Sequence, residues 1–244
     1  MNKFFIDDSQ IDGTMVYING DDVKHIRDVL RLNVGDDIEV STFKNSYIVK
    51  IKKIANNAVV GNIIKTKKDN NEPPIDIVLF QGLPKSAKME YIIQKTTEIG
   101  IKEIYPLITK RTIVKINDIQ KENKKIERWN KIVLEAAKQS KRDYVPNVKN
   151  IITFKGMIQQ FQDEENILVP YEDEKSIHLK DVVNSIKGKK INLVIGPEGG
   201  FEEEEINMLK SVGARVITLG PRILRTETAG LVVTSILLYE LGDI

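Results

Sequence analysis

The chain has 244 residues, of which 41% are hydrophobic and 30% are charged, and its formal net charge is +2. This length can bury the core of one large domain or of two unequal ones. The chain lacks cysteine and has only two isolated histidines, His25 and His178, which excludes disulfides, cysteine-zinc sites, a cysteine nucleophile and a Ser/His/Asp triad.

Membrane insertion and export are also not indicated. No apolar run approaches the roughly 18 residues that a membrane span needs. The first ten residues, MNKFFIDDSQ, lack the basic and apolar regions of a signal peptide. We therefore expect a cytoplasmic protein with no membrane partner and no metal.

Charge is unevenly distributed along the chain. Residues 85–142 carry 15 basic and 7 acidic side chains, whereas residues 143–244 carry 11 basic and 16 acidic ones. Such segregation favours a basic face for a polyanion beside a neutral or acidic pocket for another ligand. A solvated helix face is the alternative interpretation of the basic stretch.

The N-terminal part has short alternating segments broken by Asn-Gly, Gly-Asp and Asn-Asn pairs. This pattern predicts a small antiparallel barrel, with one amphipathic helix over residues 21–32 that leaves Arg27 and Arg31 on its polar side. The polar stretch 65–74, KTKKDNNEPP, predicts a linker. The predicted strands are residues 3–7, 15–19, 36–43, 46–55 and 57–65.

After Pro74 the pattern changes to apolar strands that alternate with helices. This alternation predicts a mostly parallel sheet covered on both faces, with a ligand at the loops that leave the C-terminal strand edge. The predicted strands are residues 75–82, 101–109, 166–172, 191–196 and 214–220. The predicted helices are residues 86–99, 119–141, 154–161, 176–186, 201–212 and 226–241.

Three of these loops, residues 168–174, 194–205 and 219–230, are candidates for ligand binding. GPEGG in the second loop could suggest a phosphate cradle, but it lacks the Lys-Ser/Thr of a P-loop, and Glu198 and Glu202–Glu205 would repel phosphate. A neutral or cationic ligand fits better. The alternative interpretation of Glu202–Glu205 is that they only complement a helix dipole.

The same residues carry a family resemblance. VIGPEGGFEEEEI at 194–206, followed by TLGPRILRTETAGLVVTSILLYE at 218–240, resembles the C-terminal signature of the RsmE family. HIRDVLRLNVGD at 25–36 is similar to the N-terminal domain of that family, and residues 81–107 and 128–148 are similar to its central motifs. The likeness extends across nearly the whole chain.

The resemblance implies a fold and an activity. RsmE proteins are 16S ribosomal RNA uridine N3-methyltransferases of the SPOUT class, which use S-adenosylmethionine. The implied fold is α/β: a PUA-like RNA-binding β-barrel domain at residues 1–70, then a SPOUT methyltransferase domain at residues 71–244 with a C-terminal trefoil knot. The implied partner is 16S rRNA, within the small ribosomal subunit.

The resemblance also implies site residues. Arg225 and Glu227 would be catalytic, although helix capping by Thr226 with a Glu227–Arg225 ion pair is the alternative interpretation of this segment. The cofactor-binding residues would be Pro170, Tyr171, Glu172, Ile195, Gly196, Pro197, Glu198, Gly199, Gly200, Leu219, Gly220, Ile223, Leu224, Thr228 and Ala229. The RNA-binding residues would be Lys3, Arg27, Arg31, Arg111, Arg128, Gln139 and Arg142.

Two further expectations concern the chain ends. RsmE proteins commonly have Arg where this chain has Lys3, which keeps the charge but not the bidentate phosphate recognition of arginine. The last helix is apolar on several sides, and because SPOUT relatives form dimers through this region, we expect a homodimer with Leu238 at the contact.

The composition is consistent with attack by a nitrogen atom. A cysteine-free chain cannot form the covalent adduct at pyrimidine C6 that methylation of C5 would need, whereas N3 needs only loss of a weakly acidic proton and stabilisation of the resulting charge. Two alternatives stay open: a SPOUT enzyme that modifies a different RNA nucleotide, and an assembly factor that binds RNA without catalysis.

Overall fold

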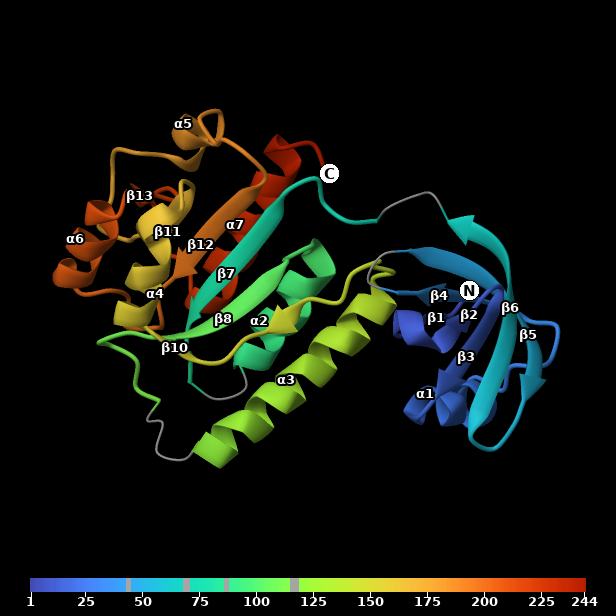
Figure 1. Ribbon diagram of the computed structural model, residues 1–244. Coiled ribbons are helices and arrows are strands. Elements are labelled where there is room, and N and C mark those ends of the chain that lie inside the picture. Colours follow the sequence, from blue (N-terminus) through green and yellow to red (C-terminus); the bar gives the residue numbers. More distant parts are fainter. Residues whose placement is uncertain (43–44, 68–70, 86–87, 115–118) are drawn as a thin grey trace. The chain divides into compact units, whose positions relative to one another are not determined.

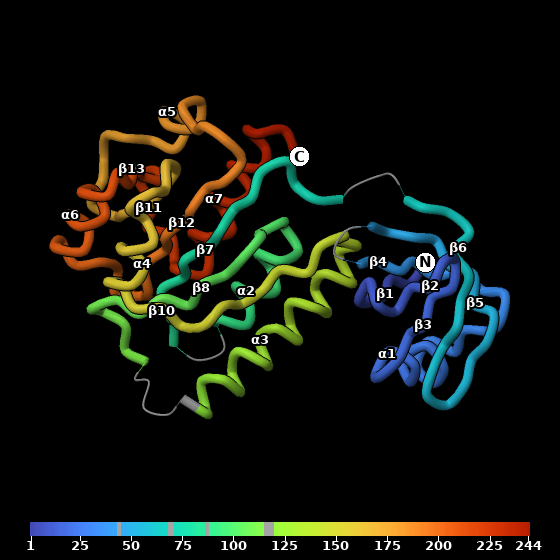
Figure 2. Tube along the Cα trace, in the orientation of Figure 1, coloured from blue at the N-terminus to red at the C-terminus, as the bar shows by residue number. Residues whose placement is uncertain are grey.

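The chain folds into two compact units. The computed structural model describes residues 1–244 except 43–44, 68–70, 86–87 and 115–118 (Figure 1). One unit comprises Met1–Glu72 together with Ala137–Val145, and the other comprises Pro73–Ala136 and Pro146–Ile244. The chain therefore returns to the first unit at the end of α3, Ile119–Gln139, and contributes residues 137–145 to it (Figure 2).

The first unit is a barrel-like sheet of six strands in the order β1-β4-β5-β6-β3-β2. Every pair is antiparallel except β1 with β4, which is parallel, so the predicted antiparallel barrel has one exception. Alternate residues of the strands form the core, as Val16 and Ile18 do on β3. The strands are β1 Lys3–Phe5, β2 Ile11–Asp12, β3 Met15–Asn19, β4 Asp37–Ser41, β5 Ser46–Ile54 and β6 Ala58–Lys67.

The predicted helix of this unit is shorter than its sequence pattern suggests. The segment α1, Asp21–Lys24, continues as one π-helical turn at His25–Val29 and buries Val23 and Ile26 in the barrel core. The chain then leaves the helix, and Arg31 has φ 52°, a left-handed conformation that no helix continues through. A short 3₁₀ turn, Asp8–Gln10, precedes β2.

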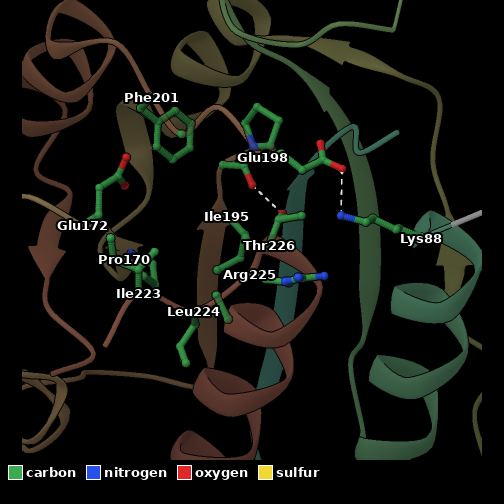
Figure 3. A pocket seen from close by; sticks show the side chains of 14 residues that line it. Lys88, Pro170, Glu172, Ile195, Glu198, Phe201, Ile223, Leu224, Arg225 and Thr226 are labelled. Carbon is green, nitrogen blue, oxygen red and sulfur yellow. Dashed lines mark hydrogen bonds and ion pairs between the residues drawn. The ribbon is translucent and has the colours of Figure 1, made fainter. Parts of the chain in front are cut away.

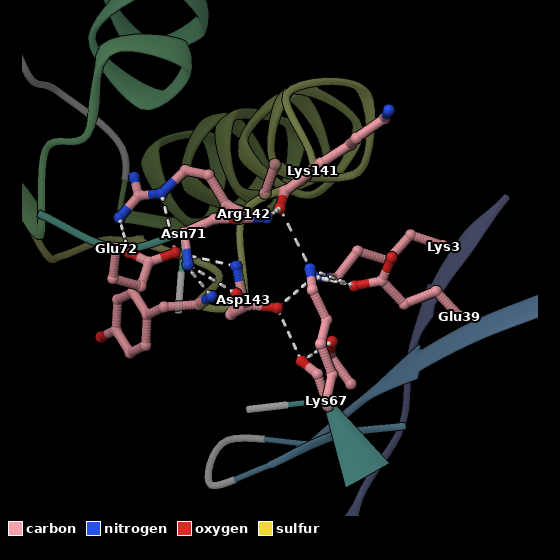
Figure 4. A network of polar contacts seen from close by, with 12 residues as sticks. Lys3, Glu39, Lys67, Asn71, Glu72, Lys141, Arg142 and Asp143 are labelled. Carbon is pink, nitrogen blue, oxygen red and sulfur yellow. Dashed lines mark hydrogen bonds and ion pairs between the residues drawn. The ribbon is translucent and has the colours of Figure 1, made fainter. Parts of the chain in front are cut away.

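A buried polar network attaches residues 141–144 to the barrel (Figure 4). The Lys3 ammonium, 1% exposed, pairs with Glu39 at 3.0 Å and with Asp143, which also accepts a hydrogen bond from the Ser46 hydroxyl at 2.6 Å. Glu72 pairs with the buried Arg142 guanidinium and accepts the backbone N–H groups of residues 143 and 144. The end of the predicted linker is thus fixed by hydrogen bonds, while its residues 68–70 lie outside the described residues.

This network corrects two predicted RNA contacts. Lys3 and Arg142 have 1% and 3% of their side-chain surface exposed, and each is held by a carboxylate within the first unit. A charge that is buried and paired in this way cannot also approach an RNA phosphate. Both side chains therefore stabilise the first unit instead.

The network makes a prediction for the pH dependence of stability. Burial opposes ionisation of Asp143, but hydrogen bonds from Lys3, Ser46 and the Asn71 backbone lower its pKa below the ordinary value. Its stabilisation is therefore complete above about pH 4 and is lost as the pH falls through the folded-state pKa. We expect Asp143→Asn to reduce the free energy of unfolding by about 1–3 kcal/mol at pH 7 and by less at pH 3, as measured by urea denaturation.

The matched control for this substitution is Asp12→Asn at an exposed position of β2. It should change stability little at either pH. A constant destabilisation by Asp143→Asn across both pH values would contradict the electrostatic origin of the effect.

The second unit is built on a parallel sheet in the order β10-β8-β7-β12-β11-β13, with β9 paired to β8. All of its strand pairs are parallel, which confirms the predicted sheet. The central strands β7 and β12 are buried at every residue after the first, as expected where helices cover both faces. The strands are β7 Asp76–Gly82, β8 Glu103–Ile108, β9 Asn147–Val148, β10 Ile152–Thr153, β11 Ile167–Pro170, β12 Lys190–Ile195 and β13 Arg215–Ile217.

The helices of this unit alternate with its longer strands as predicted, while the two-residue strands β9 and β10 between α3 and α4 were not predicted. In the described part of the chain, no helix combines the length and apolar character that crossing a membrane requires. The predicted start of α2 at residues 86–87 lies outside the described residues. Besides α3, the helices are α2 Lys88–Ile99, α4 Phe154–Gln160 with a 3₁₀ turn at Phe161–Asp163, α5 Leu179–Val183, α6 Glu203–Ser211 and α7 Thr226–Glu240.

The last helix, α7, packs against α2 and the sheet more deeply than the sequence suggests. Leu238 is fully buried, and its side chain lies 3.3 Å from the position that a Cβ atom on Gly100 would take. The prediction that Leu238 contacts a second subunit is therefore wrong, because this side chain fills the core of its own unit. The exposed apolar side chains of α7 are instead Ile236 and Tyr239, 39% and 69% exposed.

Candidate active site

A cavity of about 350 Å³ lies within the second unit where β11 and β12 end and α7 begins (Figure 3). Parallel strands direct their carboxyl ends to one edge, so the loops after them meet there. Glu172 and Phe201 lie on one side of the cavity and Lys88 lies on the other. The lining residues are Lys88, Pro170, Glu172, Ile195, Gly196, Pro197, Glu198, Gly200, Phe201, Ile223, Leu224, Arg225, Thr226 and Ala229.

A smaller cavity of about 90 Å³ shares part of this lining and adds the loop after β13. Of the residues predicted to bind a cofactor, all except Gly199 and Thr228 line one or both cavities. Phe201 and Lys88 line the larger cavity and were not predicted. The lining of the smaller cavity is Pro170, Tyr171, Glu172, Lys175, Thr218, Leu219, Gly220, Pro221, Arg222, Ile223, Leu224 and Ala229.

The loop after β12 needs its glycines for different reasons. Gly200 has φ +68°, and a Cβ atom there would lie 2.4 Å from the Glu172 carboxylate. The backbone at Gly200 thus lies directly against an acidic side chain that lines the cavity. Gly199 instead packs against Arg111, whose Cβ would be 3.0 Å from an added Cβ.

The acidic start of α6 interacts with the segment after β8 rather than with the cavity. Glu202 pairs with Arg111 at 2.9 Å, and Glu205 accepts the backbone N–H of Lys110 while its other oxygen caps the helix. The hydrogen bond to Glu202 raises the pKa of Arg111, and the same contact lowers the pKa of Glu202. These contacts agree with the alternative interpretation, in which the glutamates stabilise the start of α6 and do not contact a ligand.

Lys88 connects two carboxylates at the edge of the cavity, and its contact with Glu198 is drawn in Figure 3. Its ammonium lies 3.1 Å from Glu198 in the loop after β12 and 3.3 Å from Glu227 in the first turn of α7. The hydrogen bond to Glu198 and then that to Glu227 raise the pKa of Lys88. Burial opposes ionisation of Glu198, but backbone N–H groups and Lys88 lower its pKa. The pairing of Lys88 with Glu198 thus favours the charged form of both groups.

The start of α7 presents Arg225 and Glu227 on either side of a buried threonine. Arg225 is the N-cap residue, 81% exposed in its side chain, and its guanidinium lies 4.0 Å from the Glu227 carboxylate, which is 17% exposed. Thr226 does not cap the helix as the alternative interpretation proposed. Its hydroxyl donates to the carbonyl of Gly196 at 2.6 Å instead.

The chain is similar to known RNA methyltransferases. The family model of an RNA methyltransferase domain matches residues 71–238. A Bacillus subtilis (strain 168) protein named ribosomal RNA small subunit methyltransferase E is 37% identical over 98% of this chain and 97% of its own length. The chain belongs to the RsmE family.

Two solved structures are similar to nearly the whole chain. The Neisseria gonorrhoeae ribosomal RNA small subunit methyltransferase E, solved bound to S-adenosyl methionine, superposes with a TM-score of 0.89 at 29% identity, covering 100% of this chain and 99% of that one. A Legionella pneumophila protein solved with bound SAM gives a TM-score of 0.84 at 28% identity, covering 98% and 97%.

The remaining residues for which the RsmE resemblance implies RNA contact lie at the surface. Arg27 pairs with Asp28 and Arg128 pairs with Glu90, and in each pair the arginine stays at least one third exposed. Arg31 and Gln139 are exposed, and Arg111 is 44% exposed beside Glu202. The structure thus leaves these five available to a polyanion, while their RNA contacts stay a prediction.

Proposed function

We propose that this protein transfers a methyl group from S-adenosylmethionine to N3 of a specific uridine in 16S rRNA, in the cytoplasm and on the small ribosomal subunit. The observation that carries this proposal is the cavity at the ends of β11 and β12, with Arg225 and Glu227 at the start of the helix that borders it. Family membership supports the same reaction class.

The cavity residues fit S-adenosylmethionine in size and charge. A volume of about 350 Å³ falls within the range of small-molecule sites. Ile195, Phe201 and Leu224 supply apolar walls, and the Glu172 carboxylate would attract the positive sulfonium, whereas Glu198 is paired with Lys88. At Gly200 the backbone has no side chain, which leaves room for the Glu172 carboxylate at the cavity wall.

The residues at the start of α7 suit the chemistry at uracil N3. S-adenosylmethionine, when bound, supplies a methyl group on a sulfonium, so that only a positioned nucleophile is required. Arg225 would stabilise the negative charge that spreads onto the neighbouring carbonyl oxygens as the N3 proton leaves. Glu227 would accept that proton directly or through a water molecule. Lys88, 3.3 Å from Glu227, holds this carboxylate at the site.

Titration calorimetry with S-adenosylmethionine tests the proposal. We expect the wild-type protein to bind the cofactor and Gly200→Ala to weaken binding by about tenfold or more, because the added Cβ strains a positive φ and displaces Glu172. Gly213→Ala is the matched control, since Gly213 has φ +83° with nothing within 4 Å. A wild-type protein that binds rRNA but not the cofactor would instead indicate an assembly factor.

The role of Arg225 can be tested by single-turnover methylation of small-subunit RNA. We expect Arg225→Gln to slow methyl transfer by about 100-fold while cofactor affinity changes little, because its charge acts on the uracil in the transition state. Arg222→Gln removes the same charge three residues earlier in the loop and should have a much smaller effect. Equal losses in the two variants would mean that the loop only attracts RNA.

We propose that the first unit and the exposed basic residues guide the RNA. The predicted PUA-like role of residues 1–70 agrees with the barrel-like sheet of that unit. Arg27, Arg31, Arg111, Arg128 and Gln139 would contact phosphates, which fix register rather than sequence. The chosen uridine would then be selected at the cavity itself.

We further propose that the protein is a homodimer in which the cofactor site of one subunit is completed by basic residues of the other. Val232, Ile236 and Tyr239 recur on α7 at helical spacing, and each keeps part of its surface exposed. A stripe of this kind on the surface of a helix that is otherwise packed is suited to a symmetric contact.

Sedimentation velocity tests the dimer. We expect Ile236→Glu to produce monomers and to reduce methyl transfer, because a charge would be buried at the contact. Met208→Glu on α6 is the control, since Met208 is 38% exposed, close to the 39% of Ile236. A wild-type protein that sediments as an active monomer at assay concentration would exclude the proposed dimer.

A further inference from the structure

The hydroxyl of Thr226 lies between two segments of the site. Thr226 is 7% exposed, and its Oγ1 atom is 2.6 Å from the carbonyl oxygen of Gly196 in the loop after β12 (Figure 3). The same oxygen lies 2.8 Å from the amide nitrogen of Gln81 near the end of β7, a side chain with no exposed surface. One hydroxyl thus joins three segments that are far apart in sequence.

The direction of each hydrogen bond follows from the groups involved. A carbonyl oxygen can only accept, so Thr226 must use its single hydrogen for Gly196. The hydroxyl oxygen can then only accept from Gln81, which must present its NH₂ group. The second hydrogen of that group goes to the carbonyl of Gly82 at 3.1 Å. The orientation of the Gln81 amide is therefore set by its partners.

This orientation leaves one polar atom without compensation. Among the described residues, the Gln81 side-chain oxygen is buried and has no hydrogen-bond partner. A buried acceptor of this kind normally lowers stability, so an apolar side chain would be the more stable choice at this position. The glutamine instead supplies two hydrogen bonds, from its NH₂ group to the Thr226 hydroxyl and to the Gly82 carbonyl.

The three joined segments are also in close contact. A Cβ atom on Gly82 would lie 2.4 Å from the backbone nitrogen of Pro197, so the end of β7 presses directly against the loop after β12. Arg225 and Glu227, the chain neighbours of Thr226, project from the same turn of α7. Arg225 itself is 81% exposed and lies no nearer than 4.0 Å to Glu227.

We propose that Thr226 and Gln81 are positioning residues for methyl transfer. Their hydrogen-bond chain fixes the Gly196 backbone, which lines the cofactor cavity, relative to the turn that carries Arg225 and Glu227. Cofactor binding and placement of the catalytic side chains then depend on one buried hydroxyl. This inference rests on the proposed function, because it concerns the alignment of a cofactor with a base on the nucleotide substrate.

The experiment compares Thr226→Val, which replaces the hydroxyl by a methyl group, with Thr226→Ser, which keeps it. Cofactor affinity is measured by titration calorimetry, single-turnover methylation on small-subunit RNA, and folding by thermal denaturation. We expect Thr226→Val to weaken cofactor binding by about tenfold and to slow methyl transfer by a further factor of about ten, each close to the loss of one hydrogen bond. Thr226→Ser should retain most of both properties, within about threefold.

Gln81→Met provides the second arm, because it keeps the approximate size of the side chain and removes the amide. It should produce the same combined loss, and the double variant Gln81→Met/Thr226→Val should lose no more than the larger single loss, since both act through one chain of hydrogen bonds. If Thr226→Val does not fold, Gln81→Met alone decides.

Two results would overturn the inference. One is a folded Thr226→Val or Gln81→Met variant with wild-type affinity and rate and only a changed melting temperature, which would make the hydrogen-bond chain purely structural. The other is a Thr226→Ser variant as impaired as Thr226→Val. Failure of the wild-type protein to bind S-adenosylmethionine would be a different result, because it overturns the proposed function itself.

Discussion

The parallel pairing of β12 with β7 on one side and β11 on the other determines where the site forms. In this register all three strands end at the same edge of the sheet, so Gly82, Pro170 and Ile195 are followed by chain segments that meet. The cavity, the glycines of the loop after β12 and the Thr226 hydroxyl all depend on that edge. If β7 or β11 were antiparallel to β12, its loop would leave the opposite edge of the sheet and could not line the cavity.

The strand-and-helix alternation after Pro74 is predictable because buried parallel strands are short apolar runs bounded by turn residues. Most of the cavity lining follows too, since its residues lie in loops directly after those runs. The sequence does not indicate Lys88, because this residue starts a helix and is not in the turn directly after β7. The loop after β7 nevertheless leaves the same sheet edge as the loops that were predicted to bind a ligand. Phe201 was missed because an aromatic before a helix is normally assigned to the core.

The errors share one physical cause, which is that sequence alone does not reveal long-range pairing. Lys3 and Arg142 look like surface cations, yet their partners Glu39 and Glu72 lie 36 and 70 positions away. The first pair forms because β1 lies beside β4, and the second forms only when residues 141–144 return to the barrel. Leu238 was assigned to an interface because α7 is apolar on several sides. Its burial depends on α2, which reaches it through the close approach at Gly100.

Charge has two separate tasks in this molecule. The larger cavity is lined by two acidic side chains, Glu172 and Glu198, and by two basic ones, Lys88 and Arg225, and Lys88 is paired with Glu198. The basic excess of residues 85–142 supplies attraction for a polyanion instead. Lys88 belongs to the basic segment but lies at the cavity, where its ammonium pairs with the carboxylates of Glu198 and Glu227. Its ammonium lies between the two carboxylates and offsets their mutual repulsion at the edge of the same cavity.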